Sequence, residues 1–339
     1  MISKHHGELT EGCKRCAKGE KLVLFVTGLC PRNCLYCPLS DEKKDKDIIF
    51  ANESQVNNIK DLIEEVKISG ATGMGITGGD PVARLARTCE YISALKKEFG
   101  KEFHTHLYTS LDLLTPEKIK QLEQAGLDEF RVHPDLENKE LWPKLDLLKT
   151  TKMETVIEIP VLPKKEKEIL ELIKYAKDKV NAFNLNELEL AQTKIEEFKK
   201  QKWKTDKDTI TIKGSERTAS NIIKKARGWH VRVHYCSAQF KDEVQFTERL
   251  KNYAKKAALS TDKITDSGML LRGAIYSDQD IEELKERFPG ESFTQDNEKS
   301  RILCSVRFVR DHKHEIPKCA ILEEYPTQDR TENYKEFLS

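Results

Sequence analysis

The chain has 339 residues, enough for one large domain or two ordinary ones. Charged residues make up 34% and hydrophobic residues 38%, and the net charge of +1 indicates no general affinity for nucleic acid or membranes. No apolar run approaches the about 20 residues of a membrane span and the N-terminus lacks a signal peptide's apolar region, so we expect a cytoplasmic protein with no membrane partner.

Residues 1–20 form a polar N-terminal segment that contains Cys13 and Cys16. Two cysteines separated by two residues supply half of a tetrahedral metal site. Any further ligands must come from elsewhere in the chain.

From residue 21 to about residue 190, strand patterns alternate with helix patterns. We expect strands at residues 22–28, 73–78, 104–110, 129–134, 154–161 and 182–188. The intervals show helical spacing, at residues 54–69, 82–98, 115–126, 135–149 and 164–179. Strict alternation predicts an α/β domain whose parallel strands are joined by right-handed crossovers.

Two motifs follow the first two strands. Cys30, Cys34 and Cys37 have the spacing C-x3-C-x2-C, with Tyr36 before the last cysteine. Three thiolates need a fourth partner to complete a structural zinc site, whereas they can bind three irons of a cubane cluster and leave the fourth open. The alternatives to a cluster on these cysteines are a zinc site or three buried thiols. The second motif is Gly78-Gly79-Asp80.

These motifs resemble those of the radical S-adenosylmethionine (SAM) superfamily over about residues 20–190, and the Thr77–Pro81 version looks most like the pyruvate formate-lyase activating enzyme branch. The resemblance implies a partial (βα)6 TIM-like barrel at residues 21–190. It also implies a [4Fe–4S] cluster on Cys30, Cys34 and Cys37, reduced by a ferredoxin or flavodoxin. The cluster would cleave SAM to a 5′-deoxyadenosyl radical that abstracts hydrogen from substrate.

The same resemblance implies a setting and further contacts to SAM. Exposed clusters are attacked by oxygen, so we expect an anaerobic cytoplasm, and nothing resembles a corrinoid-binding domain, so we expect no cobalamin. Asp80 stands where glutamate is more usual. The implied SAM contacts are Tyr36 near the adenine, Gly78, Gly79 and Asp80 at the amino group, Ser110 at the ribose, Arg131 at the carboxylate, and Ile159 and Val161 beside the adenine.

Alternation along the later strands predicts a polar barrel interior. Side chains alternate between the two faces of a strand, and Arg131, His133, Glu158, Asn184 and Asn186 share the parity opposite to the apolar residues. Edge strands with one wet face are the alternative. Glu158 and His133 are the candidate catalytic residues, which would position substrate or move a proton, unless they are hydrogen-bonded structural groups.

Residues 191–339 have a different pattern, which predicts an α+β substrate-recognition domain with a subdivision near residues 260–266. We expect strands at 208–214, 229–236, 268–276, 301–309 and 319–325, and helices at 190–205, 215–227, 241–258 and 278–288.

A second metal site is a further hypothesis. His234 and Cys236 share one face of a predicted strand, and Cys319 begins another. With Cys13 and Cys16 they could bind zinc or an auxiliary iron–sulfur cluster. Buried cysteines that act as small apolar residues are the alternative.

The substrate is the least determined feature. Residues 194–256 contain 17 lysines and arginines against 8 aspartates and glutamates, with aromatic residues between them. This composition suits a polyanion such as RNA, although a solvated basic face explains it too. Our first hypothesis is therefore modification of a macromolecule such as tRNA. The alternatives are activation of a glycyl-radical enzyme, against which the long C-terminal extension argues, and small-molecule or cofactor biosynthesis.

Overall fold

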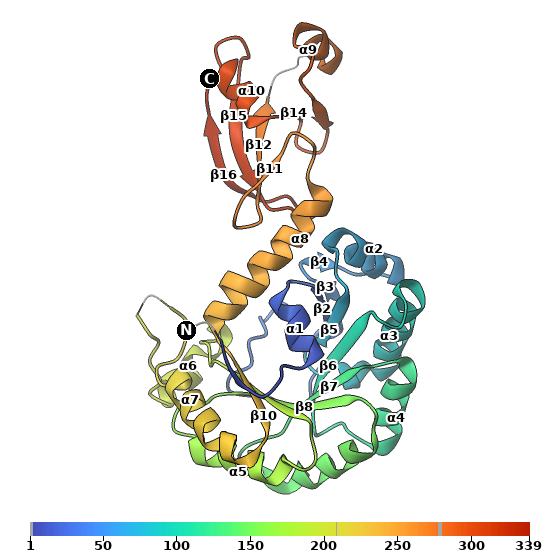
Figure 1. The fold of residues 1–339 in the computed structure, drawn as a ribbon, viewed down its shortest axis with the longest axis vertical. Coiled ribbons are helices and arrows are strands. Elements are labelled where there is room, and N and C mark those ends of the chain that lie inside the picture. The colour runs from blue at the N-terminus through green and yellow to red at the C-terminus, as the bar shows by residue number, and fades with distance from the viewer. Residues whose placement is uncertain (1–2, 208, 277–279) are drawn as a thin grey trace. The chain divides into compact units, whose positions relative to one another are not determined.

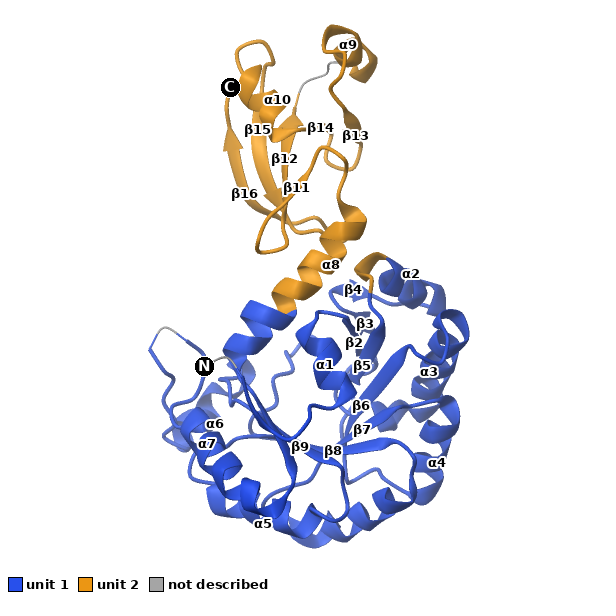
Figure 2. Ribbon diagram, viewed as in Figure 1, with its two compact units in different colours: residues 1–67, 71–245 blue, residues 68–70, 246–339 orange. Residues whose placement is uncertain are grey.

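A computed structural model describes residues 3–207, 209–276 and 280–339 (Figure 1). The chain divides into two units (Figure 2): Met1–Lys67 with Ala71–Gln245, and Ile68–Gly70 with Phe246–Ser339. The structure thus places the division after Gln245, whereas the sequence patterns placed it at residue 190.

Unit 1 is built on one sheet with the strand order β1-β10-β9-β8-β7-β6-β5-β2-β3-β4. Seven neighbouring strands run parallel, which confirms the partial TIM-like barrel. They are β2 (Lys21–Phe25), β5 (Gly73–Thr77), β6 (His104–Ser110), β7 (Glu129–His133), β8 (Glu154–Pro160), β9 (Ala182–Asn186) and β10 (Arg232–Cys236). Short antiparallel strands flank them, namely β1 (Ser3–His6), β3 (Phe50–Ala51) and β4 (Ser54–Gln55).

The seventh parallel strand, β10, lies in the region that we assigned to the C-terminal domain. Helix α7 (Ser215–Ala226) buries Ala219, Ile222 and Ile223 and forms one more crossover before β10 pairs with β9. Residues 191–245 therefore complete the barrel sheet. The predicted strand at 208–214 is wrong for the described residues 209–214, which form only isolated bridges at Thr211 and Ile212.

Helices cover the outer face of this sheet as an arc in Figure 1. They are α2 (Ile59–Ser69), α3 (Leu85–Phe99), α4 (Pro116–Ala125), α5 (Glu166–Ala176), α6 (Ile195–Lys200) and α7, with 3₁₀ helices at Pro81–Arg84, Lys139–Thr150, Gln192–Lys194 and Arg227–Trp229. Helix α4 begins and ends as its sequence predicts, because Thr115 accepts a hydrogen bond from Lys118 N and Gly126 adopts a φ of 98°.

Polar side chains line the interior of the barrel, as the alternation predicted. Leu107, Phe130, Val132, Ile157 and Leu185 are fully buried in the apolar core of unit 1. The residues between them in sequence, among them Tyr108, Arg131, Glu158 and Asn184, line a cavity inside the barrel.

Helix α1 (Glu11–Ala17) lies at the amino ends of the central strands. Thr10 caps it by accepting from Cys13 N, and Gly12 N donates to Glu129 Oε2 at 2.8 Å, at the start of β7. Arg15 Nη1 donates to Thr72 O, just before β5. This helix carries both cysteines of the N-terminal pair.

Unit 2 is an α+β fold with an antiparallel sheet in the order β13-β14-β12-β15-β16, to which β11 adds by pairing with β12. Its strands are β11 (Lys263–Ile264), β12 (Leu270–Ile275), β13 (Thr294–Asp296), β14 (Arg301–Cys304), β15 (Cys319–Glu324) and β16 (Glu332–Phe337). Its helices are α8 (Thr247–Ala257), preceded by a π-helix at Phe240–Phe246, then α9 (Ile281–Arg287) and α10 (Val306–Asp311).

Two predictions within unit 2 need correction. The predicted strand at 301–309 ends at Cys304, because Ser305 accepts a hydrogen bond from Phe308 N and starts helix α10. The pairing of β11 with β12 also joins residues 263–264 to the rest of the unit, so the chain is not subdivided there. The predicted helix at 278–288 is α9 where the structure describes it, and residues 278–279 lie outside the described residues.

No helix in the described part of the chain is long and apolar enough to cross a membrane.

Candidate active site

A cavity of about 620 Å³ lies inside the barrel of unit 1. Its walls combine the loop after β2, the Gly78-Gly79 turn after β5, the polar residues of β6 to β10, and helix α1. The carboxyl ends of parallel strands are where such barrels place their chemistry.

The loop after β2 brings Cys30, Cys34 and Cys37 to this cavity as three free, half-buried thiols. Burial raises the pKa of Cys30 to about 11 and also raises the pKa of Cys34, and the three thiols lie close enough to repel one another when ionised. Such thiols ionise when a metal shares their charge. Three mutually close thiols on one loop, facing open space, fit the three protein ligands of a [4Fe–4S] cluster.

Arg32 fixes the cysteine loop to the end of β7. Its Nη1 donates to His133 O at 3.0 Å and its Nη2 pairs with Asp135 Oδ2 at 2.6 Å. The base of the loop is held by Asp47, which accepts from Thr27 Oγ1 at 2.9 Å and pairs with Arg87.

The two sequence motifs are bonded to each other through the backbone. Gly79 N donates to Thr27 O and Asp80 N donates to Leu29 O, both at 2.8 Å. A Cβ on Gly78, whose φ is 140°, would lie 2.3 Å from Thr27 O, and one on Gly79 would lie 2.4 Å from Leu29 O. The glycines are therefore required for the approach of the two loops beside Cys30.

Asp80 and Ser110 are hydrogen-bonded to each other. Asp80 accepts hydrogen bonds from Val82 N, Thr109 Oγ1, Ser110 N and Ser110 Oγ at 2.7–3.1 Å and is 1% exposed. Neither side chain is among the described residues that line the cavity. Both groups join β5 to β6, and the predicted contacts of the Asp80 carboxylate and of Ser110 with SAM stay predictions.

Tyr36 and His133 form a rigid pair at the cavity wall. His133 Nδ1 lies 2.8 Å from the Glu158 carbonyl oxygen, so Nδ1 donates and Nε2 accepts from the Tyr36 hydroxyl at 2.7 Å. Burial, followed by the charge of Arg32, lowers the pKa of His133 to about 4. His133 is therefore neutral near pH 7, with both nitrogens engaged, and orients Tyr36.

Arg131 is the centre of a buried ionic network. It pairs with Glu129 Oε1 at 2.7 Å and with Glu158 Oε2 at 2.6 Å, and its Nη2 also donates to Cys13 Sγ at 3.3 Å. All three guanidinium nitrogens are occupied by groups of the chain, and the predicted pairing with the SAM carboxylate stays a prediction.

Glu158 faces the cavity as an anion. Burial disfavours its charge, but Arg131 and hydrogen bonds from Asn184 and Asn186 outweigh burial and lower its pKa. Ile159 also lines the cavity, whereas Val161 lies outside the described lining and its carbonyl accepts from Ser215 Oγ.

The predicted second metal site is only partly assembled. Cys13, Cys16, His234 and Cys236 line the cavity. Cys319 lies in the core of unit 2, where its Sγ contacts Ser339 Oγ, so it is removed from the predicted set.

Another group has the chemistry of metal ligands. Ligand atoms of His104, His106 and Glu129 lie within 4.8 Å of one another, and His106 Nδ1 has no partner. A Cβ on Gly12 would lie 2.8 Å from that Nδ1 and 2.5 Å from Glu129 Oε2. The backbone of α1 thus occupies the space between these groups, which serve to seat the helix.

Sequence reasoning missed Glu129, Arg32 and Lys241. Glu129 has the same parity as Arg131 and His133, so alternation could have revealed it. Lys241 pairs with Glu189 at 2.7 Å at the cavity rim, and nothing in its sequence context marks it.

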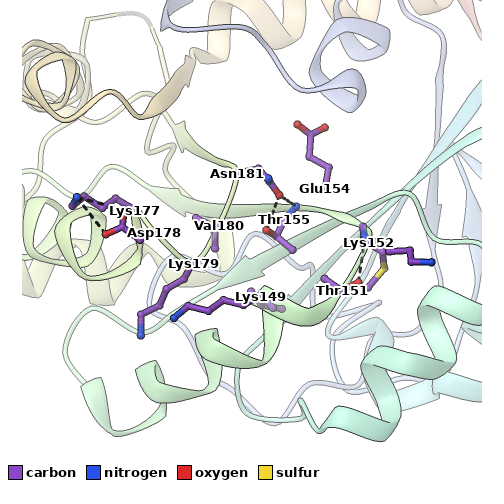
Figure 3. Close-up of a pocket in the computed structure, with 12 residues that line it drawn as sticks. Lys149, Thr151, Lys152, Glu154, Thr155, Lys177, Asp178, Lys179, Val180 and Asn181 are labelled. Atoms are coloured by element: carbon purple, nitrogen blue, oxygen red, sulfur yellow. Dashed lines mark hydrogen bonds and ion pairs between the residues drawn. The ribbon is translucent and has the colours of Figure 1, made fainter.

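A larger hollow, of about 790 Å³, lies where β8 and β9 begin (Figure 3). Lysines at positions 149, 152, 177 and 179 surround it, and Asn181 Oδ1 accepts from Thr155 N and Oγ1 at 2.7 and 2.9 Å. Figure 3 shows the Lys149 and Lys179 side chains extending away from Thr155 and Asn181. The hollow lies at the opposite ends of the strands from the cysteine loop.

Comparison with known proteins is consistent with this site. Residues 24–186 match the Radical SAM superfamily. A protein of Methanocaldococcus jannaschii named "Putative glycyl-radical enzyme activating enzyme MJ0021" is 41% identical over 295 residues, which cover 84% of this chain and 78% of that protein. Biotin synthase of Vibrio cholerae is 31% identical over 116 residues, 34% of this chain and 32% of that enzyme.

Solved structures give more distant similarities. The methyltransferase TsrM from Kitasatospora setae matches with a TM-score of 0.40 and 11% identity, over 78% of this chain and 59% of that one. Coproporphyrinogen III oxidase from Escherichia coli matches with a TM-score of 0.38 and 12% identity, over 67% of this chain and 57% of that one. The family therefore rests on the sequence matches and the paired loop motifs, and by these the chain is an enzyme of the radical SAM superfamily, whose members use a [4Fe–4S] cluster and SAM.

Proposed function

We propose that this enzyme activates a partner protein by removing a hydrogen atom from one of the partner's glycines. The observation that carries the proposal is the 41% identity to the protein named as a glycyl-radical enzyme activating enzyme. That match covers 84% of the chain, which is longer than unit 1, so it extends into unit 2. At least part of the C-terminal extension is thus shared with a protein of that name, which weakens the argument against activation.

The proposed cluster ligands are Cys30, Cys34 and Cys37. When bound, the cluster and SAM supply an electron and a 5′-deoxyadenosyl radical, respectively. The residues of the chain hold and shield these groups. The Gly78-Gly79 backbone offers close approach for the SAM amino group, and Tyr36, fixed by His133, and Ile159 give the adenine apolar contact.

The remaining cavity wall suits a peptide backbone. The Glu158 carboxylate can accept from a peptide N–H, and the Asn184 and Asn186 amides offer both donors and acceptors. A glycine brings no side chain into a space of about 620 Å³ that also holds the cluster and SAM. Glu158 therefore positions the substrate in this proposal, and His133 acts through Tyr36.

The structure offers less support for an RNA substrate. Several basic side chains of residues 194–256 are paired with carboxylates, as in Lys199–Glu196, Lys225–Glu166 and Lys241–Glu189. The tRNA hypothesis therefore yields to the activation hypothesis.

The test is deuterium transfer from glycine. Reconstituted enzyme is incubated without oxygen with SAM, a reductant and inactive glycyl-radical enzymes that contain α-deuterated glycine. Mass spectrometry of 5′-deoxyadenosine should then reveal deuterium, and electron paramagnetic resonance should reveal a glycyl radical on one partner. The Cys34→Ala variant should give neither signal, whereas Cys89→Ala, outside the described cavity lining, should give both. Abundant 5′-deoxyadenosine without deuterium from any partner, together with hydrogen transfer from tRNA, contradicts the proposal.

A further inference from the structure

Six of the nine cysteines line the barrel cavity. Cys30, Cys34 and Cys37 belong to the loop after β2. The other three, Cys13, Cys16 and Cys236, come from helix α1 and strand β10 and have no part in the proposed function. Three further thiols in one cavity, on elements more than two hundred residues apart in sequence, require an explanation of their own.

The fold brings these three thiols to one cavity through the N-terminal segment. Strand β1 pairs with β10, with Ser3 opposite Cys236 and His5 opposite His234. The chain then turns into α1, where a spacing of three residues puts Cys13 and Cys16 on one face of the helix. Gly12 holds that helix in place through Glu129, as described above. The segment that carries the pair is thus bonded directly to the strand that carries the third cysteine.

Nitrogen donors point at these sulfurs. Arg131 Nη2 donates to Cys13 Sγ at 3.3 Å, and Gln245 Nε2 donates to Cys236 Sγ at 3.6 Å. Hydrogen bonds and cations around sulfur stabilise thiolates, the form of cysteine that binds metal.

All three cysteines are free in the structure and line the same cavity.

We propose that Cys13, Cys16 and Cys236 bind a second, thiolate-ligated metal centre, either a zinc ion or an auxiliary iron–sulfur cluster. Each thiol releases its proton on binding. His234 is excluded as a ligand because Nδ1 bonds to Asn184 Oδ1 at 2.7 Å and Nε2 to Ser3 Oγ at 3.0 Å. Three protein thiols would leave one coordination position of a four-coordinate metal for another group to fill.

The proposal is independent of the proposed function, and variants separate the two. The Cys30/Cys34/Cys37→Ala variant removes the first set of thiols and should keep the second centre. After anaerobic purification and reconstitution, it should contain about one zinc per chain if the centre is zinc. It should contain iron with acid-labile sulfide, and a reduced cluster signal by paramagnetic resonance, if the centre is an iron–sulfur cluster.

The reciprocal variant, Cys13/Cys16/Cys236→Ala, should lose that metal and keep the iron of the first cluster. The Cys89→Ala variant should keep all metal. Circular dichroism verifies folding, and the single Cys236→Ser variant provides a milder change at the same site. Cobalt(II) added to metal-free Cys30/Cys34/Cys37→Ala protein should give thiolate charge-transfer absorption that Cys236→Ser weakens several-fold.

Two results overturn the proposal. One is a folded Cys30/Cys34/Cys37→Ala protein that holds neither zinc nor iron and gives no cobalt–thiolate absorption. The other is full retention of the extra metal in folded Cys13/Cys16/Cys236→Ala protein.

Discussion

Replacement of Arg131 by methionine should destabilise unit 1 strongly. Arg131 is 2% exposed and neutralises the buried carboxylates of Glu129 and Glu158 at 2.7 and 2.6 Å. Methionine fills a similar volume but leaves both carboxylates without their cation. Breaking a buried ion pair from one side costs about 3–5 kcal/mol, because the remaining charge stays buried.

The pH dependence provides a sharper test of the same network. In the wild type, Arg131 keeps the pKa of Glu158 low, so this group contributes stability above its unfolded pKa and loses it as the pH falls. In Arg131→Met, only the hydrogen bonds from Asn184 and Asn186 still oppose burial, so the protonated acid is favoured more than in the wild type. The difference in free energy of unfolding between the wild type and Arg131→Met should therefore be large at pH 8 and should shrink as the pH falls to 5.

The assay is urea unfolding of metal-free protein under reducing conditions. A loss of about 4 kcal/mol corresponds to a fall of roughly 10 °C in the melting temperature of a unit of this size. The Glu129→Gln/Arg131→Met/Glu158→Gln variant should recover at least half of that loss, because it removes the unpaired charges. Two results would refute the network as described. One is an Arg131→Met protein whose free energy of unfolding at pH 8 lies within about 1 kcal/mol of the wild-type value, and the other is a difference between the two that does not depend on pH.

Two further predictions concern the loops and the histidines. Gly79→Ala should weaken SAM binding at least tenfold, because the alanine Cβ would lie 2.4 Å from Leu29 O. The measurement is equilibrium dialysis on reconstituted protein. Gly228→Ala is the control and should bind SAM normally, since a Cβ at that position has no atom within 4 Å. Equal SAM affinity in both variants would contradict the required approach of the loops. His133 and His234 both have a pKa lowered to about 4, mainly by burial, so stability should fall as the pH drops from the unfolded value of 6.5 towards 4. Titration of each histidine should lower the free energy of unfolding by about 2 kcal/mol between pH 7.5 and pH 5. In urea unfolding, the free energy of His234→Asn should therefore depend less steeply on pH than that of the wild type. An unchanged pH dependence would mean that His234 titrates normally.

The sequence predicted the polar barrel interior because alternation is a local property of each strand. Arg131, Glu158 and Asn184 could be placed inside without knowledge of their partners. The partners themselves could not be predicted. Asp80 follows β5 and Ser110 is the last residue of β6, yet the two are hydrogen-bonded to each other, and that pairing depends on the lateral spacing of the two strands.

The boundary of the barrel could have been predicted better. The helix at 215–227 and the strand at 229–236 repeat the pattern of the earlier units, but the helix and strand expected at 190–205 and 208–214 were assigned with them to a new domain. The position of α1 could not be anticipated, because a seven-residue helix has no periodicity that reveals its docking surface.

The most direct test of the account is SAM cleavage by anaerobically reconstituted protein with dithionite as the reductant. Wild type and Cys89→Ala should produce 5′-deoxyadenosine and methionine in equal amounts. Cys34→Ala should produce neither above the background without enzyme, while it retains the fold. Cleavage at the wild-type rate by Cys34→Ala would contradict the assignment of Cys30, Cys34 and Cys37 as the cluster ligands on which the proposed function depends.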